Sequence, residues 1–274
     1  MACPDCTMGG LLNGEPTGII STQGAYFARA PGNTESTEGT DNPEFKRAVL
    51  LLTDAFGLPL KNSKIIADNL AIQLKCDVWI PDYFAGLLCP LIIWPPPPPA
   101  GVKMGFLEWM RIIFILIKSI PGFIRNRSSI VDERLAKFIR AIQEEKKYTK
   151  IGAVGYCFGG ATAVRIDSAH LIHSAVVCHP GPFTLEQVKA IKIPTAWVCA
   201  QEDMFFSDSL RDQAEAEFAR RQGSDTFVDY EFKVYKGTTH GFATRPNLDI
   251  PEIKEAYQKA FEQTVDWFEK TLVI

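Results

Sequence analysis

Apolar and polar positions divide the chain into two kinds of segment that alternate. Continuous apolar runs, typical of strands buried on both faces, occur at Arg47–Thr53, Asp77–Pro81, Lys150–Val154, Ser174–Cys178, Pro194–Ala200 and Tyr230–Tyr235. Helical periodicity occurs at Asn62–Lys75, Val131–Lys146, Leu185–Ala190, Asp208–Arg221 and Glu252–Thr271. An antiparallel pair, Ile19–Ser21 and Tyr26–Arg29, is expected to open the sheet. Strands that alternate with helices predict an α/β fold with a doubly wound, mostly parallel sheet and helices on both faces.

One segment, Pro90–Arg127, interrupts this alternation. The prolines Pro95–Pro99 predict a stiff polyproline spacer. The very apolar helix expected at Met104–Lys118 contains the charged residues Glu108, Arg111 and Lys118, so it falls short of the roughly 18 apolar residues of a membrane span. It is either a helix of the core or a lid over the substrate site that could touch a membrane surface. We expect no stable membrane insertion.

Composition narrows the class of protein. A chain of 274 residues with 46% hydrophobic content fits a single α/β domain over residues 1–274. Its net charge of −3 gives no basic footprint for nucleic acid. Seven scattered cysteines and no signal peptide indicate reduced thiols in a cytoplasmic protein. The pair Cys3 and Cys6 is only half a set of zinc ligands, so we expect neither metal nor cofactor.

The sequence Gly155-Tyr156-Cys157-Phe158-Gly159-Gly160 carries the strongest chemical signal. It follows an apolar strand and precedes a run of small residues, which is the context of a nucleophile elbow. The glycines allow a sharp turn that presents Cys157 at the edge of the sheet, and the following helix offers N–H groups to an oxyanion. The alternative, a buried structural cysteine, is disfavoured by glycines at both flanking positions.

A nucleophilic cysteine needs a base and a carboxylate that orients the base. Of the four histidines, His240 follows the last strand and fits the order nucleophile, acid, histidine. The acid is expected after Pro194–Ala200, and we choose Asp203 over its neighbour Glu202. His179 ends the neighbouring strand at the same edge, whereas His170 and His173 are expected at the opposite end of the sheet.

The segment Thr53-Asp54-Ala55-Phe56-Gly57 follows the first central strand. The amides of Ala55 and Phe158 are the expected donors of an oxyanion hole. Asp54 is either a turn residue or a carboxylate that polarises or shields the thiol.

These motifs, with Cys178-His179-Pro180-Gly181 and His240-Gly241-Phe242, resemble dienelactone hydrolases (carboxymethylenebutenolidases), in a fungal-looking branch, over nearly the whole chain. The resemblance implies an α/β-hydrolase fold with an inserted helical segment, a Cys157–Asp203–His240 triad, and a carboxylate at Asp54 that engages the resting thiol.

The sequence departs from the family pattern at two places. Asp54 is one methylene shorter than the glutamate of the bacterial enzymes. The arginine expected after Tyr83-Phe84 to bind a substrate carboxylate is replaced by Ala85-Gly86. Arg245, in the loop that carries His240, is either an anion contact or a surface residue. The candidate substrate-binding residues are Asp54, Arg245, His179 and Tyr83.

The sequence therefore predicts a hydrolase that cleaves an ester or a lactone, dienelactone-like or polyketide-derived, through an acyl-thioester intermediate. The apolar insertion motivates an alternative, a C–C bond hydrolase or thioesterase in a biosynthetic pathway. A non-catalytic binding module is disfavoured by the intact Cys, Asp and His set. The expected partner is a small-molecule substrate, and a homodimer is one candidate for the oligomeric state.

Overall fold

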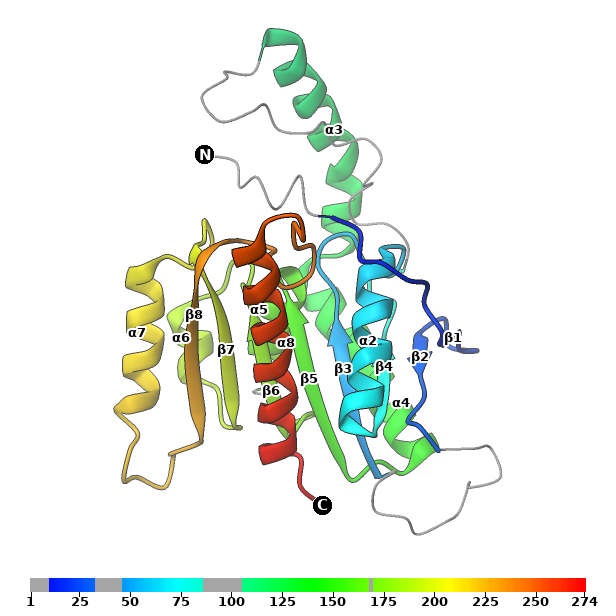
Figure 1. Cartoon of the computed structure of the whole chain (residues 1–274), viewed down its shortest axis with the longest axis vertical. Helices are drawn as coiled ribbons and strands as arrows, with labels where there is room; N and C mark the ends of the chain where they lie inside the picture. The colour runs from blue at the N-terminus through cyan, green and yellow to red at the C-terminus, as the bar shows by residue number, and fades with distance from the viewer. Residues whose placement is uncertain (1–9, 33–45, 86–104, 168–169) are drawn as a thin grey trace.

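The computed structural model describes residues 10–32, 46–85, 105–167 and 170–274, which contain one eight-stranded sheet (Figure 1). The strand order is β1-β2-β4-β3-β5-β6-β7-β8. Strands β1 and β2 run antiparallel to their neighbours and the other strands are parallel to one another, which confirms the predicted sheet. The strands are β1 (Ile19–Ile20), β2 (Tyr26–Ala28), β3 (Arg47–Leu52), β4 (Asp77–Ile80), β5 (Lys150–Tyr156), β6 (Ser174–Cys178), β7 (Thr195–Glu202) and β8 (Tyr230–Thr239).

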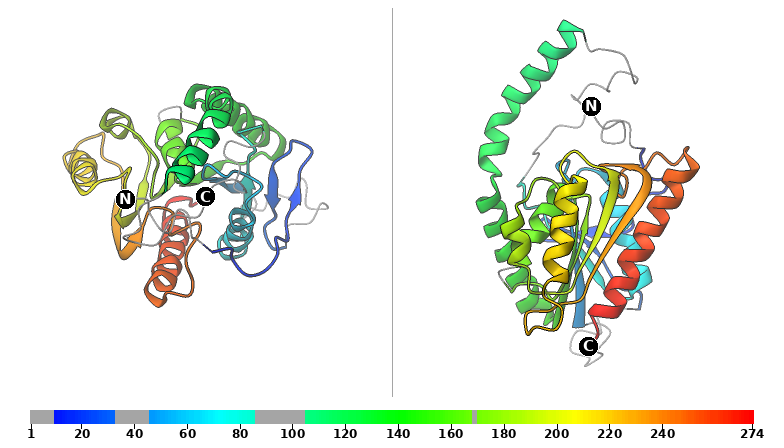
Figure 2. Two further views of the ribbon diagram at one scale, coloured as in Figure 1. Left: turned by 90° about the horizontal axis from the view of Figure 1, so that it is seen from above. Right: turned by 90° about the vertical axis from the view of Figure 1, so that its left-hand side faces the viewer.

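Helices cover both faces of this sheet (Figure 2). One face carries α2 (Lys61–Leu74) and α8 (Pro251–Thr271), and the other carries α4 (Ser128–Lys146), α5 (Phe158–Asp167), α6 (Leu185–Lys189) and α7 (Asp208–Ala219). Successive residues of the central strand β3 serve the two cores in turn, with Leu50 in one and Leu51 in the other. Both side chains are fully buried, which explains why the strand is continuously apolar.

The parallel strands all end at the upper edge of the sheet in Figure 1. Cys157, Asp203 and His240 each stand one residue beyond a strand at this edge. Open α/β sheets bind ligands at the carboxyl ends of their strands. The fold therefore gathers the candidate chemistry at one edge.

Helix α3 (Phe106–Arg125) rises from this edge and projects away from the sheet (Figures 1 and 2). It begins and ends later than the predicted Met104–Lys118. Its large apolar side chains with described positions are exposed, Phe106 by 78% and Leu107 by 81%. The alternative of a core helix is therefore wrong, and the lid stays a prediction. Within the described residues, no helix is both long and apolar enough to cross a membrane. The Pro95–Pro99 tract lies outside the described residues.

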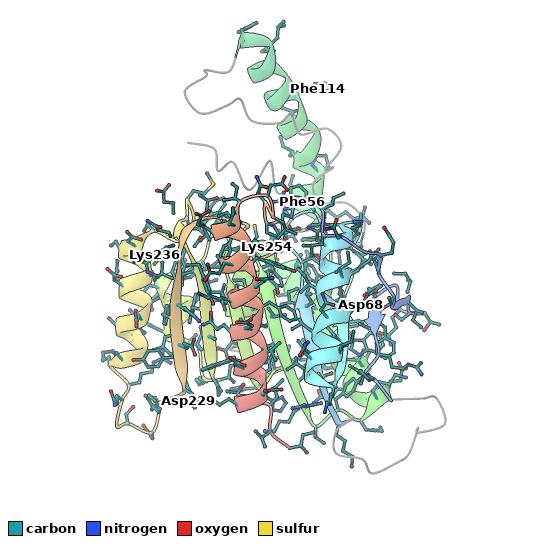
Figure 3. The ribbon with its side chains drawn as sticks, viewed as in Figure 1. Phe56, Asp68, Phe114, Asp229, Lys236 and Lys254 are labelled. Atoms are coloured by element: carbon teal, nitrogen blue, oxygen red, sulfur yellow. The ribbon has the colours of Figure 1, made fainter. Side chains whose placement is uncertain are left out.

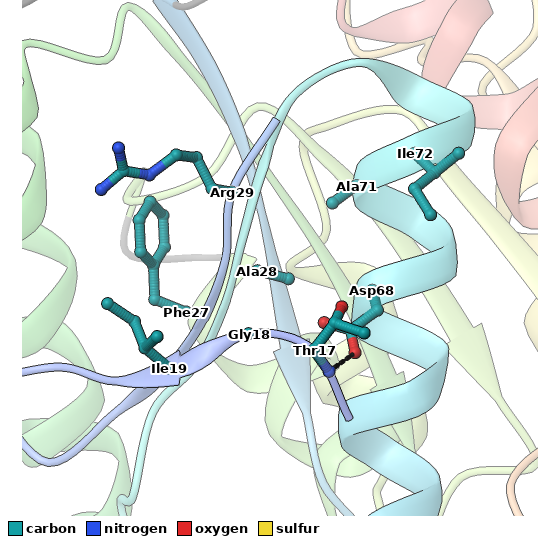
Figure 4. A pocket seen from close by; sticks show the side chains of 9 residues that line it. All are labelled: Thr17, Gly18, Ile19, Phe27, Ala28, Arg29, Asp68, Ala71 and Ile72. Carbon is teal, nitrogen blue, oxygen red and sulfur yellow. Dashed lines mark hydrogen bonds between the residues drawn. The ribbon is translucent and has the colours of Figure 1, made fainter. Parts of the chain in front are cut away.

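A hollow of about 310 Å³ lies on the flank of the molecule, between the N-terminal strands and α2 (Figure 4). Its polar centre is Asp68, which accepts hydrogen bonds from the Thr17 amide (2.7 Å) and the Tyr26 hydroxyl (2.8 Å). Both carboxylate oxygens are thus engaged by the protein. These bonds hold the N-terminal segment against α2, so the polar groups of the hollow serve the fold.

Candidate active site

Cys157 occupies a sharp turn between β5 and α5. Its φ of 51° lies in the left-handed region, where a residue with a side chain is strained and usually functional. A Cβ atom on Gly155 would lie 2.2 Å from the Gly159 carbonyl oxygen, and one on Gly159 would lie 2.1 Å from the Leu52 carbonyl oxygen. Both positions therefore require glycine. The predicted strand–turn–helix context of Cys157 is confirmed.

Backbone hydrogen bonds from the neighbouring strand ends hold this turn. The Cys157 amide donates to the Cys178 carbonyl (3.2 Å), and the Gly181 amide donates to the Cys157 carbonyl (2.7 Å). On the other side, the Gly159 amide donates to the Thr53 carbonyl (3.0 Å). Hydrogen bonds to the segments at the ends of β3 and β6 thus hold the strained turn in place.

The amides of Ala55 and Phe158 lie on either side of this turn, in the segments that follow β3 and Cys157. Among the described residues, neither amide donates a hydrogen bond. Unpaired N–H groups at the start of a helix and in a neighbouring turn are what an oxyanion hole requires. The Phe158 ring packs against Phe84 at a centroid distance of 5.0 Å, which fixes the start of α5.

The register of the last two strands brings Asp203 and His240 together. A bulge in β7 pairs Glu202 with Thr239, so the next residues on both strands are neighbours. The His240 Nδ1 atom lies 2.9 and 3.0 Å from the two Asp203 carboxylate oxygens. Both side chains are almost completely buried. Glu202, the alternative acid, is exposed.

Two backbone amides that sequence reasoning missed orient the acid. The amides of Phe205 (2.9 Å) and Phe206 (3.2 Å) donate to Asp203 Oδ1. The available signal was an aspartate in a turn four residues before Ser207, the residue that caps α7. These bonds fix the orientation of the Asp203 carboxylate, which also contacts the His240 imidazole.

The protonation of His240 follows from its neighbours. Burial lowers its pKa, but the Asp203 carboxylate and the adjacent Cys157 thiol outweigh this effect and raise the pKa to about 10. A thiol, an imidazole and a carboxylate thus stand in the order of a nucleophile, its base and an orienting acid.

Asp54 faces Arg245 next to this group. Its Oδ2 atom lies 3.4 Å from Arg245 Nε, and its Oδ1 atom accepts a hydrogen bond from the Phe56 amide (3.0 Å). Burial raises the pKa of Asp54 above its ordinary value, and the Arg245 charge and the Phe56 amide offset only part of this rise. In the described part of the chain, no hydrogen bond joins Asp54 to Cys157. The carboxylate that the resemblance assigns to the thiol is thus paired with Arg245, and it is also a turn residue.

Arg245 is buried, so the surface position considered for it is wrong. Its guanidinium carbon lies 4.2 Å from the centroid of the Phe56 ring. A cation stacked on an aromatic face and paired with a carboxylate is stabilised on two sides. Arg245 therefore carries a positive charge close to the candidate active site.

Comparison with known proteins identifies the family and the fold. Residues 118–272 match the model of the Dienelactone hydrolase family. The chain belongs to the dienelactone hydrolase family. It is 32% identical to Hydrolase tropI of Talaromyces stipitatus over 224 residues, which cover 80% of each chain. It is 28% identical to Hydrolase pyvD of Aspergillus violaceofuscus, over 97% of this chain and 96% of that one.

A solved structure supports the same fold. The structure titled putative dienelactone hydrolase from Klebsiella pneumoniae superposes with a TM-score of 0.60 at 14% identity, over 93% of this chain and 97% of that chain. Both share the α/β-hydrolase fold. Family membership makes the protein a hydrolase that acts on esters or lactones.

In this dienelactone hydrolase family member, His179 lies against the candidate base. The pairing of Tyr156 with Cys178 places Cys157 and His179 side by side at the ends of β5 and β6. The His179 ring is fully buried, and its centroid is 5.2 Å from that of His240. Burial, then the His240 and Arg245 charges, hold its pKa well below the ordinary value. This neutral ring packs against the base and is closed to solvent, and its contact with a substrate stays a prediction.

Tyr83 is also closed to solvent, and its role as a substrate-binding residue stays a prediction. Its hydroxyl donates to the Thr53 carbonyl (2.8 Å), and its ring packs edge-on against Phe84 at 4.7 Å. Burial raises the pKa of the phenol well above its ordinary range, so it stays protonated. Tyr83 therefore supports the segment that carries Asp54 and Ala55.

Apolar side chains lie next to the acid. Met204 and Phe205 follow Asp203 and are exposed, and the Phe205 ring lies 5.1 Å from that of His240.

Among the described residues, no group of three or more His, Cys, Asp or Glu could hold a metal ion. Cys3 and Cys6 lie outside the described residues.

Proposed function

We propose that Cys157, His240 and Asp203 act as nucleophile, base and orienting acid in the hydrolysis of an ester or lactone. The observation that supports this best is the buried hydrogen-bonded pair of His240 and Asp203 beside a thiol on a strained turn. Perturbed titratable groups next to a nucleophile are typical of a catalytic site.

In the first half of the reaction, the Cys157 sulfur, with its proton transferred to His240, attacks the carbonyl carbon. The oxyanion accepts hydrogen bonds from the amides of Ala55 and Phe158. Collapse of this adduct breaks the bond to the leaving oxygen, which takes a proton from His240. The product of this half is an acyl-thioester on Cys157.

In the second half, His240 takes a proton from water, and the resulting hydroxide attacks the thioester carbonyl. The same two amides hold the second oxyanion. The sulfur then leaves with a proton from His240, which restores the resting site. Because a thiolate leaves more readily than an amine, an amide adduct would revert, whereas an ester or enol-lactone goes forward. This argues for esters and lactones over peptides.

The surroundings of the site favour an apolar substrate with an anionic group. Exposed Met204 and Phe205 border the acid, and Phe56 lies under Arg245. An anionic group on the substrate would compete with Asp54 for the Arg245 guanidinium. With Ala85-Gly86 in place of the arginine that the family pattern has after Tyr83-Phe84, dienelactone itself is less favoured than a bulkier polyketide-derived lactone. Such a lactone fits enzymes of secondary metabolism.

Replacing the nucleophile tests the mechanism. Cys157→Ala should lower kcat by several orders of magnitude with an unchanged fold, as in other triads. Mass spectrometry of the wild type during turnover should reveal the acyl group on the peptide that contains Cys157. Near-wild-type esterase turnover in Cys157→Ala would refute the mechanism.

A substrate panel tests the reaction class. We expect faster turnover of aryl esters and apolar lactones than of thioesters or C–C diketones of matched size. Preference for the thioesters or diketones would favour the alternative of a thioesterase or C–C hydrolase.

A further inference from the structure

The loop that follows β8 is buried although it is irregular. Every residue from His240 to Pro246 is buried, and the loop carries Arg245 next to the candidate active site. A buried segment without regular secondary structure must find partners for its backbone N–H and C=O groups. The Arg245 amide finds one within the loop, the Gly241 carbonyl (2.9 Å). The carbonyls of Thr244 and Pro246, on either side of Arg245, take their donors from outside the loop.

Asn62, in the first turn of α2, supplies one of these donors. It is completely buried, and its Nδ2 atom donates to the carbonyls of Thr244 (3.0 Å) and Gly10 (3.0 Å). Its Oδ1 atom accepts a hydrogen bond from the Leu12 amide (3.0 Å). Two carbonyls thus face the nitrogen and an N–H group faces the oxygen. This pattern determines the orientation of the carboxamide, and it uses both of its donors.

Gly10 binds the loop on the other side of Arg245. Its amide donates to the Pro246 carbonyl (3.1 Å), while its own carbonyl accepts the bond from Asn62. The carbonyls on both sides of Arg245 are therefore bound by one connected group, formed by Asn62 and Gly10. These hydrogen bonds fix the backbone from which the guanidinium reaches the candidate site.

Asn62 also stands close to the segment that carries the partners of the Arg245 side chain. Arg245 Nε lies 3.4 Å from Asp54 Oδ2, and the guanidinium carbon lies 4.2 Å from the Phe56 ring centroid. Figure 3 shows Phe56 at the upper edge of the sheet, and hydrogen-bonded turns lead from there into α2. Asn62 and Thr244 are 182 residues apart in the sequence. Their hydrogen bond therefore joins the two segments that together place the guanidinium.

We propose that Asn62 is a positioning residue for the anion contact that Arg245 makes with a substrate. The inference rests on the proposed function, in which an anionic group of the ester or lactone pairs with the guanidinium. A misplacement of about 1 Å can cost up to about a hundredfold in rate. Loss of the Asn62 donors should therefore weaken the anion contact, although Asn62 itself bonds only to backbone. The effect should be a changed substrate preference, with a higher KM for anionic substrates.

Two esters of matched shape test this inference. p-Nitrophenyl hemisuccinate carries a carboxylate where p-nitrophenyl isocaproate carries two methyl groups, and the wild type should have the lower KM for the hemisuccinate. Asn62→Asp keeps the shape and the acceptor but loses both donors. In this variant the ratio of kcat/KM for the hemisuccinate to that for the isocaproate should fall about tenfold, mainly through KM of the hemisuccinate. Asn62→Leu should show the same fall.

Asp68→Asn is the matched control. Asp68 lies farther along the same helix, away from the edge where Phe56 lies (Figure 3), and it binds the same N-terminal segment through the Thr17 amide. Among the described residues, its hydrogen bonds reach no part of the loop after β8. This variant should keep the wild-type ratio. An equal fall in Asp68→Asn would mean that any loosening of the N-terminal segment disturbs the site, and it would overturn the role assigned to Asn62.

A double-mutant cycle separates positioning from stability. Arg245→Met should abolish the preference for the hemisuccinate, and the addition of Asn62→Asp should lower the ratio no further. A wild-type ratio in folded Asn62→Asp would show a merely structural asparagine and overturn the proposal. If neither Asn62 variant folds, Gly10→Ala decides, because its methyl group would meet the Pro246 carbonyl oxygen at 3.1 Å. It should lower the ratio by about two- to threefold, and an unchanged ratio would equally overturn the proposal.

Binding of uncleaved analogues keeps this inference separate from the mechanism. The corresponding p-nitroanilides replace the ester by an amide, and calorimetry measures their affinities without turnover. The succinyl anilide should bind the wild type about tenfold more tightly than the isocaproyl anilide, and Asn62→Asp should lose most of this difference. Ester hydrolysis that survives in Cys157→Ala would refute the mechanism and leave this comparison intact. Equal affinities of the wild type for the two anilides would overturn the inference and leave the mechanism intact.

Discussion

The Nε atom of Arg245 lies 3.4 Å from Oδ2 of Asp54, and both side chains are buried. Taking two charges out of water is costly, and their mutual attraction offsets this cost only while both are present. The Phe56 ring 4.2 Å from the guanidinium adds a second favourable contact. The pair therefore contributes little net stability, but it keeps the Arg245 charge beside the candidate active site.

Replacement of Asp54 should lower the stability of the fold. In Asp54→Asn, Arg245 keeps its charge without its partner, so we expect the free energy of unfolding to fall by about 3 kcal/mol. The double variant Asp54→Asn/Arg245→Met should recover part of this loss. Urea denaturation of the three proteins measures both effects. Equal stability of Asp54→Asn and the wild type would show that the pair is not coupled in solution.

The raised pKa of His240 predicts a pH-dependent stability. Its folded pKa of about 10 exceeds the ordinary 6.5, so its contribution is fully present below pH 6.5 and is lost as pH rises towards 10. The slope in this window is at most about 1.4 kcal/mol per pH unit. Because Asp203 raises this pKa, the stability difference between the wild type and Asp203→Asn should shrink from pH 6.5 to 10. Urea titrations across the window check this, and a constant difference would contradict it.

The nucleophile turn should tolerate no side chain at its glycines. A methyl group on Gly159 would meet the Leu52 carbonyl oxygen at 2.1 Å, and the backbone at the end of the central strand β3 cannot move away cheaply. We expect Gly159→Ala to cost more than about 3 kcal/mol of stability or to prevent folding. The control is Gly223→Ala, where φ is +79° but nothing lies within 4 Å. It should cost only about 1 kcal/mol. Thermal unfolding of both variants measures the difference, and comparable losses would argue against the close approach.

The sequence was sufficient for features that depend on local pattern and chain order. The apolar run in β3 predicted a central strand because both its faces are buried, and the order of Cys157, Asp203 and His240 placed them at one edge. Pairings between distant segments were not predictable. Asp54 and Arg245 meet only because the loops after β3 and β8 fold towards each other, which no local pattern encodes.

Side-chain direction was equally hidden from the sequence. Tyr83 and His179 stand at the correct edge of the sheet, as expected, but their rings turn into the protein. For helix α3 the sequence left two alternatives open, because its apolar composition is equally compatible with a core helix and with an exposed helix. Only the exposed positions of residues such as Phe114 exclude the core helix.

His179 offers a test of whether a buried imidazole serves packing alone. Among the described residues, neither of its ring nitrogens has a hydrogen-bond partner, and an unsatisfied buried polar atom costs about 1–3 kcal/mol. Its ring packs against those of Tyr156, Phe242 and His240. If only these ring contacts matter, His179→Phe should be as stable as the wild type or more stable, whereas His179→Ala should lose about 2 kcal/mol or more through the cavity it leaves. Urea denaturation of both variants, alongside kcat/KM on one aryl ester, measures this. A loss in His179→Phe as large as in His179→Ala would mean that the nitrogens are solvated or bonded in solution, and that the histidine acts on His240 through more than contact.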